Sequence, residues 1–204
     1  MKYLILLFIL PLILLAGGYE KVRITPEISY IHSYHKNKAI LKIHRTQDTK
    51  HKLVGEYAIT YRPNTYIQPI KIRKEIETIG EVELLKFIQH FGNHQKGLIL
   101  DVRDKKAYKK ESIPSAVNIP SSLLSNKVKM QKILKALGAK KLEDGTLDTR
   151  EAMHLIVYSH GNWCEKSPLF IKKLLALGYP PDKMLYYRGG FQMWKILGFT
   201  TVIN

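Results

Sequence analysis

The only cysteine of the chain, Cys164, lies in the stretch LIVYSHGNWCEKSPLF, residues 155–170. The stretch begins with an apolar run typical of a buried strand and continues into a polar loop that ends at a Ser-Pro pair, which is typical of a helix start. Backbone N–H groups and the helix dipole place partial positive charge in such a loop. Because a thiol there ionises more easily than a free one, Cys164 is a candidate nucleophile.

The flanking residues 160–162 (HGN) and 165–166 (EK) are polar and lie in a loop, which favours a working thiol over a buried, inert cysteine, the alternative interpretation. We expect Lys166 and His160 to favour the thiolate, and Trp163 to wall off one side of the pocket. Ser167 is expected as the helix N-cap, with Pro168 at the first helical position. A single cysteine cannot form an internal disulfide.

The rest of the chain predicts one α/β domain preceded by an extension. Residues 19–76 contain short extended pieces, residues 38–44 and 56–62, with a turn at Pro63-Asn64. Helices and strands then alternate, which indicates a parallel sheet with helices on both faces. The expected strands are residues 97–102, 153–159 and 183–190, with an extended piece at 113–120. The expected helices are residues 80–91, 105–111, 125–139, 167–178 and 189–198, and residues 140–152 are expected as a polar loop.

Residues 1–18, MKYLILLFILPLILLAGG, have the pattern of a secretory signal peptide. The apolar run from Tyr3 to Ala16 is shorter than the roughly 20 residues needed to span a bilayer. We expect cleavage before Tyr19, with an uncleaved N-terminal anchor as the alternative. The protein is therefore expected in the periplasm or outside the cell, or anchored to the membrane and facing the periplasm.

The chain is strongly basic, with a formal net charge of +16. Since export argues against nucleic acid as a partner, a functional role of the charge would point to small anions, an acidic protein or an anionic membrane surface. The lysines are scattered along the sequence, so the favoured interpretation is a solvated charged surface with no specific partner. Four histidines fall in the extension: His32, His35, His44 and His51. No carboxylate or thiol accompanies them at a useful spacing, so we expect no metal site there.

Several ordered motifs between about residues 78 and 204 resemble the rhodanese family of sulfurtransferases. They are LILDVRDKKAYKKESIPSAVNIP at residues 98–120, LIVYS with its loop and helix, and YYRGGFQMW at residues 186–194. The resemblance implies a rhodanese-like α/β fold for residues 77–204. It also implies that Cys164 accepts a sulfane sulfur from an anionic donor such as thiosulfate and passes it, as a persulfide, to a thiol or other thiophilic acceptor. No metal or organic cofactor is implied.

The resemblance also assigns supporting roles. The expected anion- or substrate-binding residues are His160, Gly161, Asn162, Trp163, Glu165, Lys166, Ser167 and Arg188. Asp101 and Arg103 either tie the first-strand loop to the active-site loop or form a local ion pair, and the ion pair is the expected outcome. Gly189 and Gly190 allow close backbone approach, and Trp194 is expected in the core.

The loop departs from the common family pattern. Rhodaneses usually carry the cysteine directly after the strand, where this chain has Ser159, and Cys164 lies five residues further on. An exported branch that this sequence resembles has a cysteine at both ends of the loop and two more near YRPNTYIQPI, residues 61–70, where this chain has none. A catalytically silent rhodanese-like binding module is therefore the alternative function. A phosphatase on the same fold would need Arg six residues after the cysteine, where this chain has Phe170.

Overall fold

The computed structural model describes residues 21–35, 39–60, 66–91 and 97–204. The expected signal peptide or anchor, residues 1–18, and the expected turn at Pro63-Asn64 lie outside these ranges. Within them, no helix is both long enough and apolar enough to cross a bilayer.

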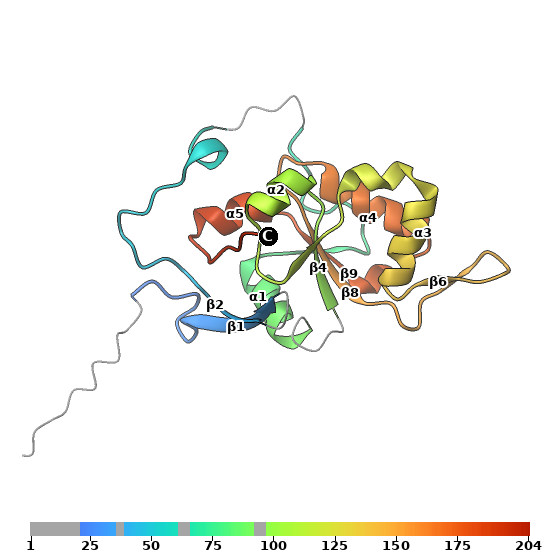
Figure 1. Cartoon of the computed structure of the whole chain (residues 1–204), viewed down its shortest axis with the longest axis horizontal. Coiled ribbons are helices and arrows are strands. Elements are labelled where there is room, and N and C mark those ends of the chain that lie inside the picture. Colours follow the sequence, from blue (N-terminus) through green and yellow to red (C-terminus); the bar gives the residue numbers. More distant parts are fainter. Residues whose placement is uncertain (1–20, 36–38, 61–65, 92–96) are drawn as a thin grey trace, which may run out of the picture.

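A five-stranded parallel sheet forms the centre of the molecule, with strand order β3-β9-β8-β4-β5 (Figure 1). The strands are β3 (Glu77–Ile79), β4 (Gly97–Asp101), β5 (Ala116–Asn118), β8 (His154–Tyr158) and β9 (Met184–Tyr187). Central strand β8 is buried from Leu155 to Tyr158, as expected for a strand covered on both faces. The expected α/β architecture is thus confirmed. The strands expected in this sheet at residues 97–102, 153–159 and 183–190 all form, and their ends differ from the predicted ones by at most three residues.

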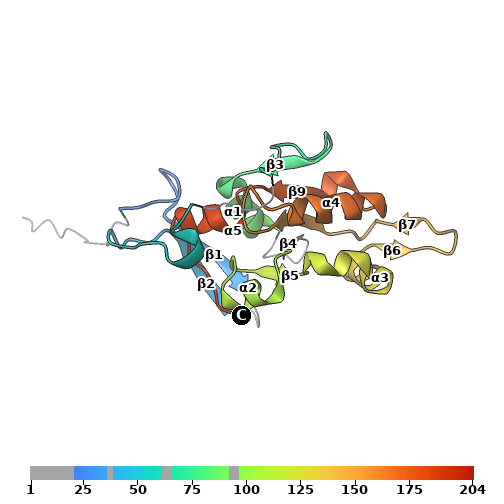
Figure 2. The ribbon, with the colours of Figure 1, turned by 90° about the horizontal axis from the view of Figure 1, so that it is seen from above.

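Helices cover both faces of this sheet, as Figure 2 shows from above. They are α1 (Glu81–His90), α2 (Lys105–Lys110), α3 (Lys127–Ala136), α4 (Lys166–Ala176) and α5 (Gly190–Ile196). On one face, α1 and α5 bury Leu84, Ile88 and Trp194 against the strands. On the other face, α3 and α4 bury Met130, Phe170 and Leu174 in a second apolar cluster. Trp194 is fully buried, as expected, and its indole N–H donates to the carbonyl of Thr200.

The described part of the extension packs on the sheet domain. Strands β1 (Tyr30–His35) and β2 (Ala39–His44) pair as an antiparallel hairpin, in which Ile31 faces Ile43, and both side chains join the α1 side of the core. The prediction of a strand at residues 56–62 is wrong for residues 56–60, the part that the structure describes. Residues Gly55–Tyr57 form a short 3-10 helix, and Ile59 is exposed with no strand to pair with.

The segment expected as a polar loop contains a small hairpin. β6 (Lys140–Lys141) pairs antiparallel with β7 (Leu147–Asp148), and the hairpin projects from the body in both views. Its turn contains Asp144 and Gly145, a pair that favours hairpin turns, and Gly145 has a φ of 86° that other residues rarely adopt. Two further 3-10 helices, Ser121–Ser125 and Pro181–Lys183, lie between elements of the sheet domain.

Candidate active site

Cys164 lies in the loop of residues 159–165, which joins the carboxyl end of β8 to the start of α4. In parallel sheets, ligands commonly bind at this edge. The N–H of Cys164 donates to the carbonyl of Gly161 at 3.0 Å and closes a tight turn. The cysteine is only 5% exposed. The thiol is therefore enclosed by the loop and its neighbours.

Helix α4 begins two residues earlier than the expected cap at Ser167 implies. Its N-cap is Glu165, whose side chain does not cap, and Lys166 is the first helical residue, so the expectation of Ser167 as N-cap was wrong. The hydroxyl of Ser167 lies 2.7 Å from that of Ser159, and both serines are buried. Because this pair occupies the Ser167 hydroxyl inside the first turn, the hydroxyl is not available as a cap.

The N-terminus of α4 and the adjoining loop offer several backbone donors. In the first turn of α4 only Lys166 and Ser167 carry an N–H, since Pro168 has none, and no N-cap side chain accepts from them. The N–H groups of Gly161, Asn162 and Glu165 also donate to no acceptor in the described part of the chain. Together with the helix dipole, these groups favour an anion beside the loop.

Tyr186, on β9, is a neighbour of Cys164 that the sequence did not single out. Its hydroxyl interacts electrostatically with Cys164 and Arg188 and lies close to Ser167. It is buried and has no hydrogen bond of normal geometry to any described residue. Burial raises the pKa of Tyr186 to about 12, so the group stays protonated and can donate a hydrogen bond.

Arg188, an expected anion-binding residue, is held by the N-terminal extension. Its Nε and Nη2 donate to the carbonyl of Gln68 at 3.0 and 2.7 Å. The N–H of Gln68 donates in turn to the carbonyl of Asn162 in the loop, at 2.8 Å. Residues 66–70 thus lie across the Arg188 side of the loop, within the region where the resemblance implied cysteines that this chain lacks.

His160 and Trp163 form the other side of the loop. Their rings stack with centroids 5.6 Å apart, and the indole N–H of Trp163 donates to Gln192 Oε1 at 3.0 Å. His160 Nε2 and Lys166 Nζ both approach Asp104 Oδ2, at 3.9 and 3.8 Å. Burial, helped by the positive charges of Arg103 and Lys166, lowers the pKa of His160, so its ring is neutral at pH 7.

Backbone hydrogen bonds from the start of α5 hold the loop in place. The N–H groups of Phe191 and Gln192 donate to the carbonyls of Ser159 and His160 at 2.9 and 2.8 Å. Gly190 adopts a φ of 61°, and a Cβ there would come within 2.6 Å of the Ser159 carbonyl oxygen. The expected close backbone approach at Gly190 is confirmed.

A family model for the rhodanese-like domain matches residues 82–197, which is more than half of the chain. The chain belongs to the rhodanese-like domain family. No curated protein matches it.

Solved structures similar to this rhodanese-like domain include a protein from Bacillus halodurans, with 22% identity, a TM-score of 0.44, and coverage of 59% of this chain and 72% of that one. A rhodanese-related protein from Thermoplasma volcanium has 25% identity and a TM-score of 0.41, covering 63% and 99%. Thiosulfate sulfurtransferase from Pseudomonas aeruginosa has 20% identity and a TM-score of 0.45, covering 63% of this chain and 20% of that one.

In this rhodanese-like domain, Asp101 and Arg103 form the expected local ion pair. Arg103 Nη2 lies 2.6 Å from Asp101 Oδ2, and both side chains are buried. The Tyr158 hydroxyl donates to the same carboxylate, and the guanidinium of Arg103 stacks on Phe191 of α5, 4.1 Å from its centroid. The pair therefore also supports the helix start that holds the loop.

The described part of the rhodanese-like domain and its extension contains no group of three or more His, Cys, Asp or Glu side chains placed to hold a metal ion. The groups described around Cys164 are backbone N–H groups, the Tyr186 hydroxyl, and the cations Lys166 and Arg188. Four residues that contact the loop or its side chains were not predicted from the sequence: Tyr186, Gln68, Asp104 and Gln192. Only Asp104 had a recognisable signal, as a helix N-cap residue that accepts the N–H of Ala107.

Proposed function

We propose that this protein is a sulfurtransferase that carries sulfane sulfur on Cys164 as a persulfide, with an anionic donor such as thiosulfate. The observation that carries the proposal is the position of Cys164. The residue directly precedes the N-cap of α4, which no side chain caps, in the loop between β8 and α4 of a rhodanese-like domain. Free N–H groups and a helix N-terminus at this point suit both a thiolate and an anionic sulfur donor.

The proposed reaction proceeds in two displacements. The Cys164 thiol first loses its proton to solvent, and the thiolate attacks the outer sulfur of thiosulfate. The S–S bond of the donor breaks, and sulfite leaves with the bonding electron pair. A thiophilic acceptor, either a thiolate or cyanide, then attacks the outer sulfur of the persulfide and releases the Cys164 thiolate. The sulfane sulfur moves without net oxidation or reduction of the protein.

The residues around the thiol would serve both displacements. Lys166 and Arg188 would attract the anionic donor, while the N–H groups of Asn162 and Glu165 stabilise the thiolate and then the persulfide. The protonated Tyr186 hydroxyl, buried beside Cys164, would donate to the anionic sulfur. His160, being neutral, contributes packing against Trp163 and adds no positive charge at pH 7.

Residues 66–70 affect how a donor anion can reach Arg188. Cys164 is only 5% exposed, and the Arg188 guanidinium is bound to the Gln68 carbonyl. A donor anion that uses Arg188 therefore has to replace this carbonyl. Because an anion forms stronger hydrogen bonds with a guanidinium than a neutral carbonyl does, the exchange is favourable once the donor enters.

The test is sulfur uptake by the full-length chain. The protein is incubated with thiosulfate and cyanide, thiocyanate is followed, and intact mass is examined for one added sulfur. We expect the wild type to gain the sulfur and Cys164→Ser to gain none. Ser159→Ala is the matched control, because it removes the other loop-end group of the family pattern and leaves Cys164 in place. It should retain sulfur uptake.

A catalytically silent binding module is the alternative to this enzyme. It is the better account if the wild type shows neither the added sulfur nor thiocyanate with thiosulfate or with any other sulfane donor. Sulfur uptake that persists in Cys164→Ser would also exclude the proposed carrier.

We propose further that the protein works outside the cytoplasm, since residues 1–18 have the pattern of a signal peptide or anchor. Its basic charge would suit an acidic protein partner or an anionic membrane surface. Fractionation of the producing cell and N-terminal sequencing of the purified protein test this. A cytoplasmic protein that keeps Met1 would contradict it.

A further inference from the structure

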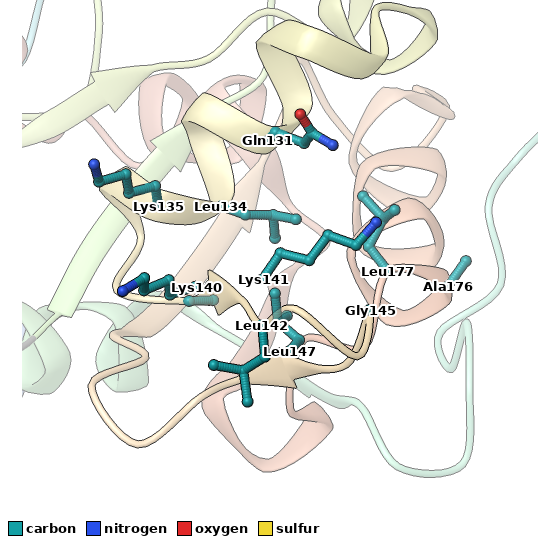
Figure 3. Close-up of a pocket in the computed structure, with 11 residues that line it drawn as sticks. Gln131, Leu134, Lys135, Lys140, Lys141, Leu142, Gly145, Leu147, Ala176 and Leu177 are labelled. Atoms are coloured by element: carbon teal, nitrogen blue, oxygen red, sulfur yellow. The ribbon is translucent and has the colours of Figure 1, made fainter.

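A cavity of about 570 Å³ lies far from Cys164, between the carboxyl-terminal half of α3, the β6–β7 hairpin and the end of α4 (Figure 3). Helix α4 connects the two places, since it begins beside Cys164 and ends at Ala176 on the cavity wall. At about 1.5 Å per residue, its two ends are roughly 15 Å apart. The volume falls within the range of roughly 300–1,000 Å³ that is typical of small-molecule sites.

The cavity has an apolar floor. Leu134 and Ala139 are buried members of the α3–α4 core, and Leu147 and Leu177 are half-buried against the same core. Leu142, at the mouth, is 43% exposed. Water in the cavity therefore contacts leucine side chains, and a hydrocarbon group that displaced this water would be bound favourably.

Positive charge surrounds this floor. The lining includes Lys135, Lys140 and Lys141 but no carboxylate. Neither Lys135 nor Lys141 forms a salt bridge with any residue in the described ranges. The ends of α3 and α4 contribute only about half a negative charge each, which three lysines outweigh.

Two of the hairpin carboxylates, Asp144 and Asp148, are already engaged, and the third, Glu143, does not line the cavity. Asp144 accepts hydrogen bonds from the N–H and the hydroxyl of Thr146, and Asp148 forms an ion pair with Arg150 at 2.7 Å. Neither carboxylate lines the cavity. The potential inside the cavity is thus set mainly by the lysines.

The polar groups are arranged so that one end of a ligand can meet donors while the rest meets leucine. Figure 3 shows the Lys141 side chain extending across the cavity toward Leu177, with the amide of Gln131 facing the same space from α3. Lys135 and Lys140 lie on the side away from α4. Lys141 and Gln131 would therefore contact a head group, and the other two lysines would add to the field around it.

We propose that this cavity binds an amphipathic organic anion, with an anionic head group and a single hydrocarbon chain. The chain would lie on Leu134 and Leu147, and the anionic head group would bind the Lys141 ammonium and the Gln131 amide N–H near Leu177. This site is separate from Cys164 and does not depend on sulfur transfer. Neutral or cationic molecules with the same chain would lose the charge-assisted hydrogen bond and would bind more weakly.

Isothermal titration calorimetry on the full-length protein tests the proposal, with decanoate, decanol and decyltrimethylammonium as probes below their micelle concentrations. Decanoate should bind roughly tenfold more tightly than decanol, the effect of one charge-assisted hydrogen bond. Lys141→Gln should remove this advantage and leave decanol binding unchanged. Leu142→Asp, which places a carboxylate at the exposed mouth, should abolish decanoate binding without unfolding the protein.

Lys132→Gln is the matched control, because Lys132 lies on α3 and does not line the cavity. It makes the same change of charge and should leave decanoate affinity unchanged. The proposal is overturned if decanoate does not bind, if decanol binds equally well, or if Lys132→Gln weakens binding as much as Lys141→Gln. Decanoate binding that survives Leu142→Asp would locate the chain elsewhere, for example at the apolar residues 3–16, and would overturn it as well.

Discussion

Replacing Gly190 with alanine should distort the loop that contains Cys164. At a φ of 61°, an alanine is strained by about 1–2 kcal/mol relative to its normal conformation. Its Cβ would also lie 2.6 Å from the Ser159 carbonyl oxygen and 2.8 Å from the Gly161 nitrogen. Both are backbone atoms, so the loop itself must move, and such overpacking costs about 1–3 kcal/mol. The total loss of unfolding free energy is therefore roughly 2–5 kcal/mol.

Gly55→Ala separates the two contributions, because Gly55 has the same φ of 61° but no atom within 4 Å of the point where a Cβ would lie. Urea denaturation of both variants should show a loss at Gly190 that exceeds the loss at Gly55 by about 1–3 kcal/mol. Native-state alkylation with iodoacetamide should be faster in Gly190→Ala, since the loop that buries Cys164 is displaced. Equal losses of stability together with unchanged alkylation would refute the idea that α5 holds the loop.

Three further predictions concern single side chains. Arg103→Met leaves the Asp101 carboxylate buried without its cation and should lower the unfolding free energy by about 3–5 kcal/mol in urea denaturation, and a loss below about 1 kcal/mol would contradict the buried pair. Tyr186→Phe removes a buried hydroxyl that has no hydrogen bond of normal geometry in the described structure, so stability should stay within about 1 kcal/mol. The same change should slow persulfide formation, measured by mass spectrometry on quenched samples, and an unchanged rate would remove Tyr186 from the site. The pKa of His160 is lower in the folded state than its unfolded value of about 6.5. The contribution of the neutral ring to the free energy of unfolding is therefore complete above pH 6.5 and is lost as the pH falls toward the folded-state pKa. Unfolding free energies at pH 7.5 and 5.5 should therefore differ less in His160→Gln than in wild type, and an equal difference would contradict the burial effect.

The sheet and the helices on both faces could be predicted because their patterns are local. Buried strands such as β4 and β8 are continuous apolar runs, and α1 and α3 repeat apolar residues at helical spacing. The β6–β7 hairpin could also have been found, since Asp144-Gly145 between short paired segments is a turn signal. The expected strand at 56–62 failed because its alternating pattern meets no neighbouring strand, so the described part stays outside any sheet.

The candidate site was predicted only where it is contiguous in sequence. The loop from Ser159 to Ser167 was identified around Cys164, but its partners come from distant segments. Gln68 binds Arg188 through its backbone carbonyl, and no side-chain pattern could have indicated that. The start of α4 was misplaced because the Ser167 hydroxyl pairs with Ser159 rather than capping the helix.

The hydrogen bonds around Cys164 join parts of the chain that are synthesised at very different times. Gln68 lies 120 residues before its partner Arg188, and Gln192 lies 29 residues after Trp163. A growing chain that has reached β8 and α4 already holds most of the sheet, yet the loop still lacks the α5 residues that hold it. The loop around the thiol is therefore held in place only once Phe191 and Gln192 have been made. A protein cut or fused just before Gly190 would expose Cys164 to oxidants even with all five parallel strands present.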